Sequence, residues 1–185
     1  MRKIIVSEFV TLDGVMEAPE TWQFPYFSAD VAEDTKNNIL TTDAFLLGRV
    51  TYDIFAASWP NQTNNEFDIA DKLNSSPKFV ISNTLQKAGW NNSTVIKGDG
   101  VEEVAKLKQQ DGGVMGITGS ATLVQALLEA NLVDELQLQV HPIVLGSGKR
   151  LFKEGLNIQA LKLISSKVYS SGVVLLTYQP DKKEE

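Results

Sequence analysis

The feature that most constrains the fold is an alternation of short apolar runs with segments of helical periodicity. The apolar runs are short and several are rich in β-branched residues, so we expect them to be strands. They fall at 4–10, 44–47, 78–82, 94–96 and 114–117. Segments with apolar residues at helical spacing follow at 28–40, 49–57, 67–73, 101–105 and 120–128. This order of strands and helices predicts an α/β fold built on a largely parallel sheet.

The pattern changes after Asp134, where strand-like segments follow one another without helices. Residues 136–140 alternate apolar and polar side chains, which is the period of a strand with one wet face. Two more apolar stretches, at 161–169 and 173–178, are joined by Ser170-Ser171-Gly172, a sequence that favours a hairpin turn. The sheet should therefore end in an antiparallel C-terminal edge.

Composition narrows the classes of function. A chain of 185 residues can bury one core, so we expect a single domain over 1–180 and a solvated tail at 181–185. The net charge of −6 argues against nucleic-acid binding, and no apolar run is long enough to span a membrane. Without Cys and with one histidine, His141, we expect no metal site, and we expect His141 to be an ordinary strand side chain. The N-terminus turns polar too early for a secretory signal, which predicts a cytoplasmic protein.

Residues that directly follow a strand are candidate site residues, because ligands of such sheets bind beyond the carboxyl ends of the strands. The second predicted strand is followed by Gly48, Arg49 and Thr51. Glycine allows a tight turn into the next helix, whose first N–H groups could bind an anion together with the guanidinium and the hydroxyl. The alternative is that Gly48 is only a turn residue and Arg49 a solvated charge.

The same arrangement recurs after the strand at 114–117, where Thr118, Gly119 and Ser120 lead into a helix. Gly119 and Ser120 would let a diphosphate approach the backbone closely at the helix N-terminus. The alternative is a capped helix start with Thr118 or Ser120 as the N-cap residue. The residues alone leave both interpretations open.

A third junction follows the strand at 78–82, which ends in Ser82, Asn83 and Thr84. Their hydroxyl and amide groups suit a ribose or its phosphate. They equally suit a turn closed by serine or asparagine side chains, because these side chains readily bond to nearby backbone. Taken alone, this segment favours the turn.

Taken in order, these junctions resemble the dihydrofolate reductase-like superfamily. Within it, the chain is most similar to stand-alone relatives of the reductase domain in the bacterial bifunctional deaminase–reductase of riboflavin synthesis. The segments that carry the resemblance keep their order along the chain. They are Thr11-Leu12-Asp13-Gly14, Gly48-Arg49-Val50-Thr51-Tyr52, Ser82-Asn83-Thr84, Thr118-Gly119-Ser120-Ala121-Thr122-Leu123, and Pro142-Ile143-Val144-Leu145-Gly146-Ser147-Gly148 with Leu151-Phe152.

The resemblance implies a three-layer α/β/α fold with about eight strands and with NADPH lying across the strand ends. It implies that the cofactor phosphates bind after the second strand and at 118–123, the 2′-phosphate ribose at 82–84, and the nicotinamide near the end of the first strand. The implied cofactor-binding residues are Phe9, Val10, Met16, Gly48, Arg49, Thr51, Ser82, Asn83, Thr84, Thr118, Gly119, Ser120, Ala121, Thr122 and Leu123. We expect NADPH and not NADH because Arg49 and the hydroxyl groups suit a 2′-phosphate.

A reductase of this kind also needs a group that assists proton transfer. The candidate carboxylates are Asp13, Glu17 and Asp30. Asp30 is the nearest candidate for the acidic residue that true dihydrofolate reductases carry at the start of their first helix. The interval between Asp30 and Gly48, however, does not fit the family's pattern cleanly. The alternatives are that Asp13 closes a turn at Asp13-Gly14 and that Asp30 interacts with the helix dipole.

By this resemblance, the expected activity is an NADPH-dependent reduction of a small molecule, possible substrates being a ribosylaminopyrimidine phosphate of the riboflavin type or a folate-type pterin. A second hypothesis is a protein that binds NADPH without turnover, because fold does not fix function. We also expect a homodimer, since the C-terminal strands at 161–169 and 173–178 would leave an apolar sheet edge or face to cover.

Overall fold

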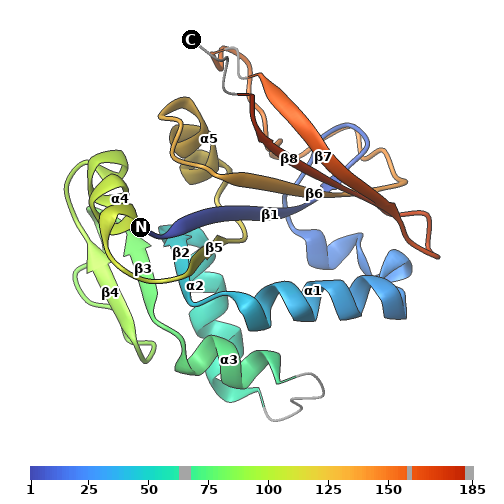
Figure 1. Cartoon of the computed structure of the whole chain (residues 1–185). Coiled ribbons are helices and arrows are strands. Elements are labelled where there is room, and N and C mark those ends of the chain that lie inside the picture. The colour runs from blue at the N-terminus through green and yellow to red at the C-terminus, as the bar shows by residue number, and fades with distance from the viewer. Residues whose placement is uncertain (63–67, 158–159, 182–185) are drawn as a thin grey trace.

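The computed structural model describes residues 1–62, 68–157 and 160–181, and its centre is one eight-stranded sheet (Figure 1). The strand order is β4-β3-β2-β5-β1-β6-β8-β7. The strands are β1 (Lys3–Thr11), β2 (Ala44–Gly48), β3 (Lys78–Ile81), β4 (Ser93–Ile96), β5 (Val114–Ile117), β6 (Glu135–His141), β7 (Leu161–Val168) and β8 (Val174–Pro180). The first six strands pair in parallel, and β8 pairs antiparallel with both β6 and β7. The predicted mixed sheet with an antiparallel C-terminal edge is confirmed.

The helices cover both faces of this sheet. They are α1 (Ala29–Thr41), α2 (Arg49–Ser58), α3 (Ile69–Ser75), α4 (Gly100–Gln109) and α5 (Ala121–Glu129), with short 3₁₀ turns at Pro19–Thr21, Phe24–Tyr26 and Trp59–Asn61. Alternate residues of β2 show the two faces. Leu46 packs in the core that α4 and α5 cover, whereas Phe45 and Leu47 pack with α2 and α3. Figure 1 shows α1 on the side of α2 and α3. The three-layer α/β/α prediction is therefore confirmed.

Most element boundaries differ from the expected ones by a residue or two, whereas α4 continues to Gln109, four residues beyond the expected segment. The helix predicted at 67–73 is α3, which begins at Ile69, and Phe67 lies outside the described residues. The predicted tail also lies outside them, apart from Asp181. Within the described part of the chain, every helix is too short or too polar to cross a bilayer.

The sheet opens between its two central strands at their carboxyl ends. β1 pairs with β5 only as far as Val6 and Ile117, whereas it pairs with β6 through to Thr11 and His141. In the described structure, the last residues of β1 therefore have a strand partner on one side only. This opening faces the turns that lead into α2 and α5.

Candidate active site

The N-termini of α2 and α5 meet at the carboxyl end of the sheet, and two glycines make this approach possible. A Cβ atom on Gly48 would lie 2.3 Å from Ser120 Oγ and 2.6 Å from Ser120 Cβ. A Cβ atom on Gly119 would lie 3.0 Å from Thr51 Oγ1. Each turn thus packs against the other helix start. We call the convergent segments 48–51 and 118–122 the cradle, because two helix N-termini direct N–H groups and positive dipole ends to one place.

The turn before α5 has the backbone conformation that sequence reasoning expected a glycine to allow. Gly119 has φ +79° and Ser120, the N-cap residue, has φ +78°. In the described structure neither Ser120 nor Gly48 caps its helix with a side chain. The alternative of a helix start capped by the Ser120 hydroxyl is therefore not what the structure shows.

Arg49 lies at the edge of the cradle, beside the third predicted junction. Gly48 is opposite Ile81 in the parallel β2–β3 pair, so Arg49 and Ser82 leave neighbouring strands side by side. The Arg49 Nε atom donates to Asp53 Oδ2 over 2.6 Å, and the Arg49 side chain remains 40% exposed. The Arg49 guanidinium is therefore accessible at this edge, and its contact with a ligand stays a prediction.

The segment 82–84 forms the side-chain-closed turn that its residues favoured. Ser82 Oγ accepts hydrogen bonds from the backbone N–H groups of Thr84 and Leu85, at 3.3 and 3.1 Å. Asn83 bonds to both the N–H and the carbonyl of Gly98. Ser82 and Asn83 therefore shape the loop, and a role of 82–84 in ribose binding stays a prediction.

The three residues expected near the nicotinamide do not share one surface. Val10 lies in the core covered by α4 and α5, and Met16 packs against the same core. Phe9 points to the opposite face of β1, where its ring centroid lies 5.6 Å from that of His141. Val10 and Met16 thus pack with the same core, and Phe9 lies across the strand.

Two of the candidate carboxylates bind loop backbone and are held in the ionised form. Asp13 accepts hydrogen bonds from the Thr11 hydroxyl and from the N–H groups of Gly146 and Leu145. These bonds, the Thr11 hydroxyl first, lower the pKa of Asp13 to about 2. The Ser28 hydroxyl and the Ser170 N–H likewise lower the pKa of Asp30.

The third candidate, Glu17, also binds backbone. Its Oε2 atom accepts a hydrogen bond from the Lys149 N–H over 2.9 Å. Asp13 and Glu17 therefore join the loop after β1 to the loop after β6, whereas Asp30 joins the start of α1 to the β7–β8 turn. The structure does not bring the three carboxylates to one point, and their part in proton transfer stays a prediction.

Sequence reasoning missed Glu8, a buried acid at the opening beside β1. Glu8 is 4% exposed, and both of its carboxyl oxygens lie within 3.0 Å of the Gly119 N–H. Burial raises the pKa of Glu8 to about 8 despite the hydrogen bond from Gly119, which lowers it. The signal was present in the sequence, because Glu8 occupies the same inward-facing register as Ile4, Val6 and Val10.

The expectation that β6 has one wet face is wrong, because α1 covers that face. Gln139 is buried and donates to the Thr35 hydroxyl on α1, and His141 is fully buried. The rings of Phe9, Trp22 and Tyr26 surround the imidazole edge-to-face at 5.0 to 6.0 Å. Burial lowers the pKa of His141, which favours the neutral ring.

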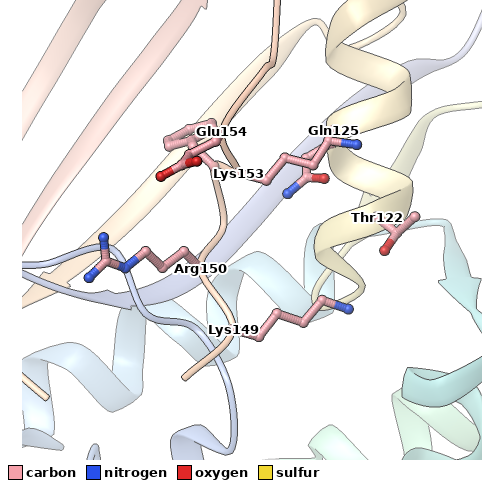
Figure 2. Close-up of a pocket in the computed structure, with 7 residues that line it drawn as sticks. Thr122, Gln125, Lys149, Arg150, Lys153 and Glu154 are labelled. Atoms are coloured by element: carbon pink, nitrogen blue, oxygen red, sulfur yellow. The ribbon is translucent and has the colours of Figure 1, made fainter. Parts of the chain in front are cut away.

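A cavity of about 320 Å³ lies beside the first two turns of α5 (Figure 2). Figure 2 shows Lys149 and Lys153 extending towards Thr122 and Gln125 of the helix, whereas Arg150 points away. The Gln125 side chain donates a hydrogen bond of 2.6 Å to the Leu151 carbonyl, which joins α5 to the loop on the other side of the cavity. The cavity is lined by Thr122, Gln125, Lys149, Arg150, Phe152, Lys153 and Glu154. It adds positive charge near the α5 side of the cradle.

Among the described residues, no group of three or more histidines and acids is arranged to hold a metal ion. The described site therefore consists of backbone N–H groups, hydroxyls, Arg49 and the buried acid Glu8.

Known proteins share both the sequence pattern and the fold. The family model of the RibD C-terminal domain matches residues 2–175. The uncharacterized protein YyaP of Bacillus subtilis is 31% identical over 179 residues, which cover 96% of this chain and 94% of YyaP. A Shewanella sp. PV-4 protein assigned to riboflavin biosynthesis superposes with a TM-score of 0.72 at 22% identity, covering 97% of this chain and 99% of its own. Dihydrofolate reductase from Enterococcus faecalis, complexed with NADP(H), superposes with a TM-score of 0.65 at 14% identity, covering 97% of both chains.

Proposed function

The chain belongs to the RibD C-terminal domain family, as its motifs predicted, and from this premise we propose that it is an NADPH-dependent reductase of a small molecule. The observation that carries the proposal is the convergence of the α2 and α5 N-termini through Gly48 and Gly119. Two helix N-termini provide several N–H donors for a diphosphate within one short span. A single capped helix start would not need this close approach.

Different parts of the cofactor would bind at different places along the carboxyl edge of the sheet. The N–H groups of 49–51 and 120–122 would bind the phosphates, since the Gly119 N–H donates to Glu8, and Arg49 with Thr84 would face the adenosine ribose. The opening beside β1 would receive the nicotinamide near Val10 and Met16. When bound, NADPH supplies a hydride, and the protein orients it and excludes water. The joined loops 12–17 and 143–151 would form the wall that keeps water out.

The substrate proposed first is a ribosylaminopyrimidine phosphate, which is reduced to its ribityl form in the riboflavin-type reaction. A pterin is the competing substrate. Asp13, Glu17 and Asp30 remain the proposed helpers of proton transfer. Because their pKa values are lowered, Asp13 and Asp30 would act by orienting or stabilising a protonated group, not by donating a proton. An ionised carboxylate has no proton to donate near neutral pH.

Steady-state NADPH oxidation against a panel of ribosylaminopyrimidine and pterin substrates tests the proposed activity. We expect turnover with a member of the first class. Turnover with pterins alone would reassign the substrate. Tight NADPH binding without turnover on either class would favour the non-catalytic alternative, and the reductase proposal would fail.

We expect NADPH to bind about tenfold to a hundredfold more tightly than NADH, because a charge-assisted hydrogen bond contributes about 1.5–3 kcal/mol. Arg49→Ala should weaken NADPH binding and leave NADH binding nearly unchanged. Asp53→Ala is the matched control, because it removes the ion pair of Arg49 and keeps the guanidinium. Calorimetric titration of the wild type and the two variants with each nucleotide measures all six affinities. Equal dissociation constants for the two nucleotides in the wild type would contradict the 2′-phosphate assignment.

We also propose a homodimer that forms through β7, which is the edge strand of the sheet beside β8. Leu163, Ile164 and Val168 on β7 are 49%, 47% and 74% exposed. A strand at a sheet edge with exposed apolar side chains commonly pairs with another chain. Val168→Lys should give a folded monomer, because the side chain is exposed within one subunit and the added charge opposes pairing at the sheet edge. Light scattering at micromolar concentration decides the point, and a monomeric wild type would contradict the proposal.

A further inference from the structure

Glu8 is the strongest feature that the proposed mechanism leaves unused. It lies on β1, two residues beyond Val6, the last β1 residue that pairs with β5. Its carboxyl group therefore fills the opening between the two central strands. There both oxygens face the N–H of Gly119, at 2.9 and 3.0 Å. Glu8 thus contacts the cradle through Gly119, in the segment that leads into α5.

Charged side chains do not compensate Glu8. Leu138 of β6 lies opposite Glu8, and the turn before α5 consists of uncharged Thr118, Gly119 and Ser120. The nearby loop 143–151 carries Lys149 and Arg150, but neither forms an ion pair with Glu8 in the described structure. Burial and the Gly119 N–H are the two causes that act on the Glu8 pKa, which is raised to about 8. At neutral pH the carboxyl group is therefore protonated and uncharged.

We propose that Glu8 is a positioning residue of the cradle: its carboxyl group holds the Gly119 amide, and it repels phosphates once it is ionised. The proposal rests on the proposed function, because the anion in question is the cofactor diphosphate. A neutral carboxyl group accepts the Gly119 hydrogen bond and fixes the turn, so the next amides point away from the sheet towards the ligand. A carboxylate at the same place adds a negative charge beside the phosphates in a partly dry site.

The proposal predicts a specific pH dependence of NADPH binding. Only the protein with neutral Glu8 binds tightly, so the dissociation constant should rise above pH 8 by about tenfold per pH unit. Between pH 7 and pH 9 this gives about tenfold weaker binding. Binding near pH 8.5 should also take up a proton, which calorimetry in buffers of different ionisation enthalpy measures directly.

Three variants separate this role from a merely structural one. Glu8→Gln keeps an oxygen that accepts from Gly119 and cannot ionise, so NADPH binding should match the wild type at pH 7 and stay constant to pH 9. Glu8→Leu removes the acceptor, so NADPH binding should be weaker at every pH. Glu102→Gln changes an exposed carboxylate of α4 and is the matched control, which should keep the wild-type pH dependence.

The ligand-free protein gives a readout that is independent of NADPH. The amide resonance of Gly119 in ¹⁵N–¹H spectra should titrate with a midpoint near pH 8 in the wild type and not in Glu8→Gln. A Gly119 resonance that ignores pH in this range would overturn the proposal. So would NADPH affinity that is flat from pH 7 to 9, or that falls equally in Glu8→Gln. A titrating Gly119 resonance with no NADPH binding at any pH would overturn the proposed function, and the cradle role with it.

Discussion

Replacing Gly48 with alanine should weaken NADPH binding by tenfold or more. The new Cβ would lie 2.3 Å from Ser120 Oγ and 2.6 Å from Ser120 Cβ. The hydroxyl can rotate away, but the Cβ atom is fixed to the backbone, so the turn before α5 must move. Displacing one helix N-terminus from the other breaks the alignment of the donors, and each charge-assisted hydrogen bond is worth about 1.5–3 kcal/mol. Calorimetric titration at pH 7 measures the loss.

A second substitution should restore what the first removes. Ser120→Gly deletes both atoms that the alanine would meet, and glycine readily adopts the positive φ of this position. The double variant Gly48→Ala/Ser120→Gly should therefore bind NADPH nearly as well as the wild type. Gly89→Ala is the matched control, because a Cβ there meets nothing within 4 Å. Normal binding by Gly48→Ala alone would show that the convergence of α2 and α5 is irrelevant to the cofactor.

Glu8→Gln should stabilise the protein at alkaline pH much more than at acidic pH. The folded-state pKa of Glu8 is about 8, against an ordinary value of 4.5. Between these values the folded protein keeps a proton that the unfolded chain releases, so the free energy of unfolding falls as pH rises. The fall is about 1.4 kcal/mol per pH unit, or roughly 4–5 kcal/mol in all, and it ends above pH 8. Glutamine has no such dependence.

Urea unfolding of both proteins at pH 5, 6, 7 and 8 measures this effect as a difference. Other titrating groups cancel, including Lys78, whose pKa burial lowers to about 8, because both proteins carry them. The stability gain of Glu8→Gln should grow steadily across the series. A gain that is the same at pH 5 and pH 8 would mean that Glu8 titrates normally in the folded state.

Local sequence patterns were sufficient to predict a largely parallel sheet with an antiparallel C-terminal edge, whereas the three-layer architecture was implied by the family resemblance. β1 and β2 are marked by apolar runs, and the α5 segment by its helical spacing, so each local preference agrees with the final fold. The carboxyl-end turns followed from the same patterns, because Gly48 and Gly119 each stand between a strand and a helix.

Contacts between distant segments were beyond that reasoning. The approach of Gly48 to Ser120 depends on β2 and β5 being neighbours, which no local pattern reveals. The burial of Gln139 depends on α1 packing across β6, and that of His141 on Trp22 and Tyr26 from the segment before α1, against a polar face that alone suggests solvent. Gly119 is another example of a contact that the local pattern did not reveal. A side chain at this position would meet Thr51 and not only a bound ligand. Gly119→Val should therefore destabilise the fold as well as the cradle.

The central claim is that the N-termini of α2 and α5 together bind the phosphates of NADPH. Backbone ¹⁵N–¹H spectra recorded at pH 7 while NADPH is added test this claim most directly. We predict saturable shifts that are largest for the amides of 49–51 and 120–122. The absence of shifts at millimolar NADPH, or shifts confined to the cavity residues between Lys149 and Glu154, would contradict it.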